Sequence, residues 1–201
     1  MLGEDENSPT GSAGDGATPL DPDEAEGLVP NHIQTVSGLN QWEQANILRA
    51  EEWAFSHRRK DMLETPFLRE VHRRMFDETW TWAGTFRKTE KNIGVAPDTI
   101  AARLHDLLSD VVYWLEHRTY ALDEIAGRFH HRLVAIHPFP NGNGRHGRLM
   151  SDLLLWNHGA EPFTWGRGDL QATSKVRGRY LKALRAADSG DIKPLIQFAR
   201  S

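Results

Sequence analysis

The stretch HPFPNGNGRHGR, from His137 to Arg148, constrains the fold of this chain more than any other. It places glycine at positions 142 and 144, where the missing Cβ allows backbone conformations that are closed to other residues. Successive N–H groups can then turn inward and form a nest that attracts an anion. Apolar residues recur downstream at helical spacing, so we expect the turn to begin a helix whose positive N-terminal end adds to this attraction.

Two arginines and one histidine accompany the turn. Arg145 and Arg148 are three residues apart and therefore share one face of the expected helix. Pro138 should end the preceding helix, which leaves His137 at a helix terminus beside the nest. A base next to a phosphate cradle indicates a group-transfer site.

The same stretch resembles the Fic (Fido) signature, HPFx(D/E)GNGRxxR. The matching positions are His137, Pro138, Phe139, Gly142, Asn143, Gly144, Arg145 and Arg148. One position differs, because Asn141 stands where the family usually has the acidic residue that holds a divalent metal. The stretches TPLDPDEAEGL, LNQWEQANILRAEEWA and WAGTFRKTEKNIG resemble the Fic branch called mobile mystery protein B, so the resemblance spans residues 18–201.

The resemblance implies a protein adenylyltransferase that transfers AMP from ATP to a Tyr, Ser or Thr hydroxyl of a target protein. His137 would be the general base, since an imidazole suits proton removal near neutral pH. The nucleotide phosphates would be bound by Gly142, Asn143, Gly144, Arg145 and Arg148. Phe139 is expected to anchor the loop. For Asn143, an amide contact to phosphate and a role in holding the turn stay equally open.

ATP is the implied co-substrate, together with Mg²⁺. Asn141 offers the metal only a neutral carbonyl oxygen, so we expect the ion to be held weakly. Two alternatives stay open: a Doc-like phosphotransferase, and a catalytically weak module of a toxin–antitoxin-like pair that binds nucleotide or a partner. The branch resemblance also implies a helix-turn-helix partner protein.

A flap for target binding is expected from Thr85 to Val95. Fic proteins use a β-hairpin near the signature to hold a target segment in extended form, and the one convincing hairpin pattern here is TFRKTEKNIGV. An ordinary surface hairpin is the alternative. The flap residues are Thr85, Phe86, Arg87, Lys88, Thr89, Glu90, Lys91, Asn92, Ile93, Gly94 and Val95.

An inhibitory glutamate is a further feature of many Fic proteins, in which it reaches the second signature arginine from a helix. This chain does not reproduce the usual (S/T)xxxE(G/N) pattern, and Glu43 in LNQWEQAN is the nearest candidate. An exposed helix glutamate is the alternative interpretation.

Helical periodicity dominates the remainder and predicts a mainly α, Fic-type domain of about seven to eight helices with one short hairpin. The expected helices begin after Ser37, at Pro66, near Asp98 and at Leu122, and then follow the glycine turn as far as Gly159; two more cover residues 174–187 and 191–201. Adjacent His130 and His131 point in different directions on their helix, which favours packing or surface roles over a shared metal.

Composition is consistent with one folded domain over residues 17–201, preceded by a disordered acidic tail at 1–16. The chain of 201 residues has no cysteine and no apolar run of membrane-spanning length, from which we expect a cytoplasmic protein. Residues 1–30 hold eight acidic and no basic side chains, so the body is mildly basic. That charge suits nucleotide phosphates but not direct nucleic-acid binding.

Overall fold

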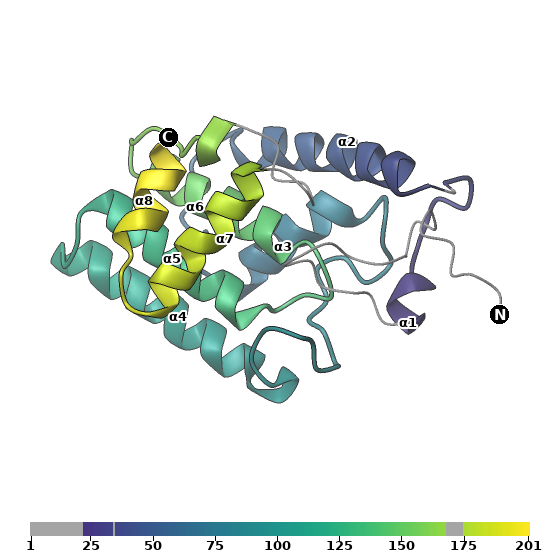
Figure 1. Ribbon diagram of the computed structural model, residues 1–201, viewed down its shortest axis with the longest axis horizontal. Coiled ribbons are helices and arrows are strands. Elements are labelled where there is room, and N and C mark those ends of the chain that lie inside the picture. The colour runs from purple at the N-terminus through teal and green to yellow at the C-terminus, as the bar shows by residue number, and fades with distance from the viewer. Residues whose placement is uncertain (1–21, 34, 168–174) are drawn as a thin grey trace.

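The computed structural model describes residues 22–33, 35–167 and 175–201. Helices make up the regular structure of these residues, and Figure 1 shows their arrangement. The α-helices are α1 (Pro22–Ala25), α2 (Val36–Ala54), α3 (Thr65–Phe76), α4 (Ile100–His117), α5 (Leu122–Ile136), α6 (Asn143–Asn157), α7 (Lys175–Asp188) and α8 (Lys193–Arg200). Two short 3₁₀ helices, η1 (Pro97–Thr99) and η2 (Trp165–Arg167), complete them.

Helix α5 is the centre of the packing, since it contacts α4, α6 and α8. Helices α2 and α4 lie on opposite sides of the molecule, with α3, α5 and α6 between them (Figure 1). The buried apolar side chains form one connected cluster, and its largest fully buried members include Phe76, Phe129, Phe139, Met150 and Leu154. The predicted helical fold class is confirmed. None of the described helices has both the length and the apolar character needed to cross a membrane.

The predicted helix limits agree with the structure to within a few residues. Thr35 rather than Ser37 caps α2, because its Oγ1 accepts a hydrogen bond from the Gly38 N–H at 3.1 Å. Helix α8 begins at Lys193 rather than Asp191, and the Asp191 carboxylate accepts a hydrogen bond from the Lys193 N–H at 3.2 Å. The acidic tail predicted at residues 1–16 lies outside the described residues.

The hairpin predicted at residues 85–95 does not form. Within the described residues, the only β pairing is an isolated antiparallel bridge between Leu28 and Trp80. The Arg87 side chain explains the difference, because its Nη1 donates to Thr89 O at 2.9 Å and its Nη2 donates to Val95 O. The guanidinium therefore joins the two arms of the segment in place of a backbone ladder.

Segment 85–95 also pairs with the chain that leads into the glycine turn. The Arg87 N–H donates to Pro138 O at 3.0 Å, and the Val95 N–H donates to Ile136 O at 3.3 Å. These hydrogen bonds fix the segment against the end of α5.

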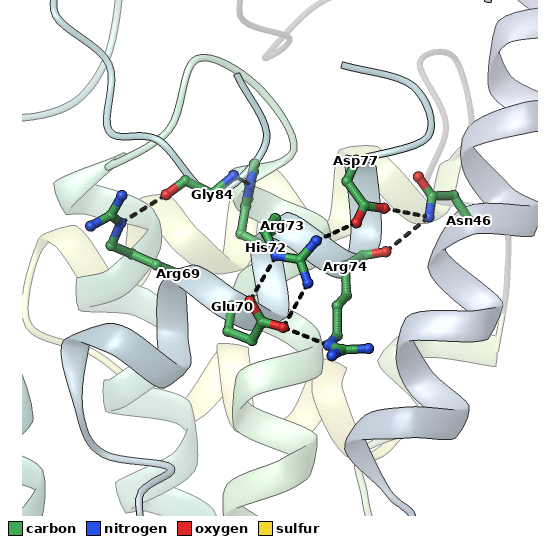
Figure 2. Close-up of polar contacts among 8 residues, drawn as sticks. All are labelled: Asn46, Arg69, Glu70, His72, Arg73, Arg74, Asp77 and Gly84. Atoms are coloured by element: carbon green, nitrogen blue, oxygen red, sulfur yellow. Dashed lines mark hydrogen bonds and ion pairs between the residues drawn. The ribbon is translucent and has the colours of Figure 1, made fainter. Parts of the chain in front are cut away.

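Figure 2 shows the polar contacts of helix α3 with Asn46 of α2 and with Gly84. Arg73 donates to Glu70 at 2.7 Å and to Asp77 at 2.6 Å, which stabilises the helix along its exposed side. Asn46 on α2 donates from Nδ2 to Arg74 O at 2.9 Å, so the two helices are joined where α3 ends.

Gly84 returns the chain onto α3, with a φ of +73°. Its N–H donates to His72 Nδ1 at 3.0 Å, and its carbonyl accepts from Arg69 Nε at 2.8 Å (Figure 2). A Cβ at this position would lie 2.8 Å from Arg73 Cβ and 2.9 Å from Arg69 O. The backbone conformation and the close approach both require glycine here.

We predict that Gly84→Ala destabilises the fold more than Gly190→Ala does. Gly190 also has a positive φ, of +92°, but no described atom lies within 4 Å of a Cβ built on it. Both variants therefore bear backbone strain, whereas only Gly84→Ala adds a clash, which costs about 1–3 kcal/mol. Urea unfolding of the two variants measures this difference, and equal free energies of unfolding would contradict the close packing.

Candidate functional site

The turn from His137 to Gly142 joins the end of α5 to the start of α6. His137 closes α5 in a left-handed conformation (φ 54°, ψ 61°), and the next residue is Pro138. The hydrogen bonds within α6 begin with the His146 N–H, which donates to Gly142 O at 2.9 Å. The N–H groups of residues 143–145 therefore precede the internal bonding of the helix, as an anion-binding helix terminus requires.

Asn143 fastens the turn to itself. Its Oδ1 accepts from the Phe139 N–H at 2.9 Å, and its Nδ2 donates to Phe139 O at 2.8 Å. Asn143 is buried, and Phe139 is fully buried. Of the two roles left open by the sequence, this arrangement favours the one that holds the turn.

His72 supports the turn from α3 as a neutral imidazole in one tautomer. Its Nδ1 accepts from the Gly84 N–H, so the proton is on Nε2, which donates to Asn141 O at 3.1 Å. The ring stacks on Phe139 with 3.6 Å between centroids and 17° between planes. Burial holds the pKa of His72 well below its usual value, which preserves this neutral form.

Asn141 directs its amide oxygen into the turn. This Oδ1 accepts from the Gly142 N–H at 2.6 Å. Among the described residues there is no group of three or more His, Cys, Asp or Glu side chains that could hold a metal ion. A neutral amide already engaged with the backbone is a poor ligand for Mg²⁺, so the donor set here does not fit a protein-held metal.

His137 is buried beside segment 85–95. Burial lowers its pKa to about 4, and the charges of Arg87 and Lys91 act in the same direction, while a hydrogen bond with the Val134 backbone raises it. Arg87 Nε also donates to the His137 carbonyl at 2.6 Å. A Cβ on Gly94 would lie 2.8 Å from His137 Cβ and 2.6 Å from Arg87 Nη2, so the segment touches the histidine directly.

Arg145 forms an ion pair with Glu43, a residue 102 positions away in the sequence. The distance from Arg145 Nη1 to Glu43 Oε2 is 2.5 Å, and Glu43 Oε1 accepts from Trp80 Nε1 at 2.7 Å. Glu43 is only 5% exposed, so the interpretation as an exposed helix glutamate is wrong. The family pattern had suggested that the glutamate reaches the second signature arginine. Instead, Glu43 reaches the first one, Arg145.

Arg148 faces α7 rather than α2. Its guanidinium carbon lies 5.9 Å from the centre of the Tyr180 ring, and the guanidinium interacts with the Tyr180 hydroxyl. Burial lowers the pKa of Arg148, and the nearby charge of Arg145 adds to this effect. The two guanidinium groups thus repel each other at the start of α6, and an anion between them would relieve that repulsion.

Residues 62–155 match the Fic/DOC family, and this span contains the turn, its support on α3 and both arginines. The chain carries a Fic domain. Curated relatives include the protein adenylyltransferase fic-1 of Caenorhabditis briggsae, 32% identical over 137 residues, and the protein adenylyltransferase Fic of Drosophila grimshawi, 31% identical over 143 residues. These matches cover 64% and 69% of this chain but only 25% and 27% of the relatives, so the chain spans about a quarter of their length.

Solved structures share the Fic fold. Fic-1 from Caenorhabditis elegans (residues 134–508) superposes with a TM-score of 0.65 at 25% identity, over 87% of this chain and 51% of that one. An N-terminal Fic domain from Bartonella quintana with bound ADP gives a TM-score of 0.66 at 18% identity, covering 88% and 94% of the two chains. BepC of Bartonella tribocorum with bound AMPPNP also gives 0.66, at 17% identity, covering 90% and 97%.

Sequence reasoning missed His72, Trp80 and Tyr180, and for His130 it predicted packing or a surface role but not its partner; all four contact signature residues or their partners. His72, Trp80 and Tyr180 lie far from the turn in sequence, whereas His130 is on α5, which leads into the turn. Each fits its local apolar pattern as a packing residue. The glycine at position 147 is a weak sequence signal for the position of His130, because a Cβ there would lie 3.2 Å from His130 Nδ1.

The four buried histidines predict a loss of stability in acid. Burial lowers the pKa of His130 to about 3 and the pKa values of His137 and His146 to about 4, and the pKa of His72 is lowered as well. Below pH 6.5 the unfolded chain therefore binds protons that the folded chain does not. The free energy of unfolding should be at its full value above pH 6.5. It should fall toward pH 4 by about 1.4 kcal/mol per pH unit for each histidine.

Urea unfolding between pH 7.5 and pH 4.5 measures this slope. His146→Gln keeps a donor for Leu68 O, which His146 Nε2 contacts at 2.9 Å. Because one histidine is removed, the slope of the unfolding free energy against pH should fall by about 1.4 kcal/mol per pH unit. His57→Gln, at the surface, controls for replacing a histidine. A stability independent of pH in this range would mean that the folded protein binds these protons too.

Proposed function

We propose that this chain is a protein adenylyltransferase that transfers AMP from ATP to a hydroxyl group of a target protein. The observation that carries the proposal is the pair of arginines near the open N-terminus of α6, directly after the turn that begins with the buried His137. The relatives named protein adenylyltransferase share the Fic domain and support this reaction. The nucleotide-bound Fic structures support ATP as the co-substrate.

His137 acts as the general base in this proposal. The target hydroxyl loses its proton to the imidazole as its oxygen attacks the α-phosphorus of ATP, and pyrophosphate leaves. The negative charge of bound triphosphate would raise the pKa of His137 from its low value and make it a better base. The site thus gains its base strength only when the nucleotide is in place.

The phosphate contacts divide between backbone and side chains. The N–H groups of Asn143 and Gly144 face the α-phosphate oxygens, and Arg145 stabilises the charge that develops on them. Arg148 holds the γ-phosphate and so fixes which phosphorus faces His137. Gly142 contributes by its close packing on Phe76, since a Cβ there would lie 2.5 Å from that ring.

Mg²⁺ would enter with ATP, held by the phosphates. This follows from the poor fit of Asn141, whose oxygen already accepts the Gly142 N–H. When bound, the ion offsets phosphate charge, while the chain itself supplies base, arginines and backbone donors.

Segment 85–95 is the proposed target-binding flap, although it is an irregular loop and not a hairpin. It lies directly over His137 through Gly94, so a target segment that pairs with its backbone would be delivered to the base. Lys91 forms a buried ion pair with Glu24 at 2.5 Å, which fixes the flap to α1.

The finer assignments rest on resemblance. We propose membership of the mobile mystery protein B branch, a helix-turn-helix partner protein and a cytoplasmic location, on the sequence stretches and composition described above. A Doc-like phosphotransferase is the competing reaction. A weak nucleotide-binding module of a toxin–antitoxin-like pair is the competing non-enzymatic function.

Labelled ATP distinguishes these functions. Purified protein in a cell extract should transfer label from [α-³²P]ATP to protein, and His137→Ala should reduce this by about 100-fold or more because the general base is lost. His117→Ala, exposed at the end of α4, is the matched control and should keep full activity. Label from [γ-³²P]ATP would instead indicate a phosphotransferase, and no transfer from either position would favour the binding module.

Glu43 is the proposed inhibitory residue. It occupies Arg145 with one oxygen and Trp80 with the other, so the arginine is directed toward α2 and away from a phosphate. A triphosphate must compete with this buried carboxylate for the same guanidinium. Removing the carboxylate should therefore favour productive binding of ATP.

We predict that Glu43→Gly increases the rate of adenylylation severalfold. Glu52→Gly is the matched control, because Glu52 lies exposed on the same helix and bears the same cost of about 1 kcal/mol for a glycine in a helix. Initial rates with [α-³²P]ATP measure the effect. If Glu43→Gly lowers the rate and the melting temperature together, the ion pair is structural and the inhibitory role is wrong.

A further inference from the structure

The contacts of Arg148 extend into the core through two side chains that no sequence motif marks. Tyr180 on α7 is buried, and its hydroxyl lies 2.8 Å from Nε2 of His130 on α5. The Arg148 guanidinium on α6 lies beside the same side chain, with its carbon 5.9 Å from the centre of the Tyr180 ring, and interacts with the hydroxyl. Three helices thus contribute one residue each to a continuous set of polar contacts.

The polarity of these contacts is fixed by chemistry. A guanidinium has only N–H donors, so the Tyr180 oxygen presents a lone pair to Arg148. The Tyr180 hydroxyl must then donate its own proton to His130 Nε2, which requires a neutral imidazole with a free lone pair on that nitrogen. His130 is completely buried, and this burial lowers its pKa to about 3, so the neutral form is maintained.

The hydroxyl lies next to the proposed phosphate cradle. A Cβ built on Gly144 would lie 3.7 Å from Arg148 Nη1 and 3.9 Å from Tyr180 Oη. The hydroxyl therefore restrains one edge of the guanidinium at the start of α6. Within the described part of the chain Arg148 forms no ion pair, so its other N–H groups can meet a ligand.

Core packing also holds His130 and Tyr180 in place. The His130 ring contacts Trp165 with 4.6 Å between centroids, and Gly147 leaves room for it on α6. The Tyr180 ring packs 5.7 Å from Phe198 on α8. The hydroxyl is thus presented to Arg148 from a position that core packing determines.

We infer that Tyr180 and His130 are positioning residues that aim Arg148 at the terminal phosphate of the nucleotide. The inference rests on the proposed function, in which Arg148 binds the γ-phosphate. It assigns the preference for a triphosphate over a diphosphate to a hydroxyl on α7, outside the signature. His130 acts through Tyr180. Because its imidazole accepts the hydroxyl proton, that proton is directed away from Arg148 and an oxygen lone pair faces the guanidinium.

The test compares AMPPNP and ADP, which differ in the terminal phosphate group, by calorimetric titration in the presence of Mg²⁺. Tyr180→Phe keeps the ring and removes the hydroxyl, so the affinity for AMPPNP should fall about tenfold while the affinity for ADP changes little. In turnover, the KM for ATP should rise more than kcat falls. Tyr120→Phe, half-buried against Trp114 and away from α7, is the matched control and should change neither affinity.

Two further variants separate positioning from folding. His130→Gln can still accept from the hydroxyl and should keep the wild-type preference, whereas His130→Leu should lose it as Tyr180→Phe does. In an Arg148→Ala background, Tyr180→Phe should have no further effect on AMPPNP affinity, because the hydroxyl acts through that arginine.

The outcomes are distinct. If Tyr180→Phe keeps the wild-type preference for AMPPNP, or weakens both nucleotides equally, this inference is overturned while the proposed function stands. If the wild-type protein binds neither nucleotide, the proposed function fails and the inference fails with it.

Discussion

The signature turn depends on one side chain behind it, the neutral imidazole of His72. Its two nitrogens have opposite tasks, since Nδ1 accepts from Gly84 and Nε2 donates to Asn141, and its face stacks on Phe139. Only one tautomer of one protonation state satisfies all three contacts. The turn can therefore expose its N–H groups to a ligand on one side because it is bonded and packed on the other.

Local pattern was sufficient for the helices but not for the contacts among them. Apolar spacing, Pro66 and Gly159 predicted where helices lie, because those signals act within a few residues. The pairs that shape the site are remote in sequence, since His72 and Asn141 are 69 positions apart and Glu43 and Arg145 are 102 positions apart. A periodic pattern cannot say which polar residue another helix will present.

The hairpin prediction is wrong for a related reason. The stretch TFRKTEKNIGV is the best candidate for a hairpin in the sequence, but the Arg87 guanidinium binds the backbone carbonyls of Thr89, Val95 and His137. A buried cation with several donors can replace a ladder, since each carbonyl needs only one partner and not a regular one. The result is an irregular segment fixed to the end of α5, close enough for its charge to lower the pKa of His137.

The two signature arginines are held by partners of different kinds, and this difference gives ligand binding an order. Arg145 forms an ion pair with a carboxylate, which a phosphate must displace, whereas Arg148 lies against the neutral Tyr180 hydroxyl and the carboxylates of Asp152 and Glu51 act on its charge only from a longer distance. A terminal phosphate therefore meets less competition at Arg148 than the α-phosphate region meets at Arg145. We expect the nucleotide to bind first at Arg148, on the side of the site next to α7. The negative charge of its phosphates then attracts Arg145 and favours breaking the ion pair between Arg145 and Glu43.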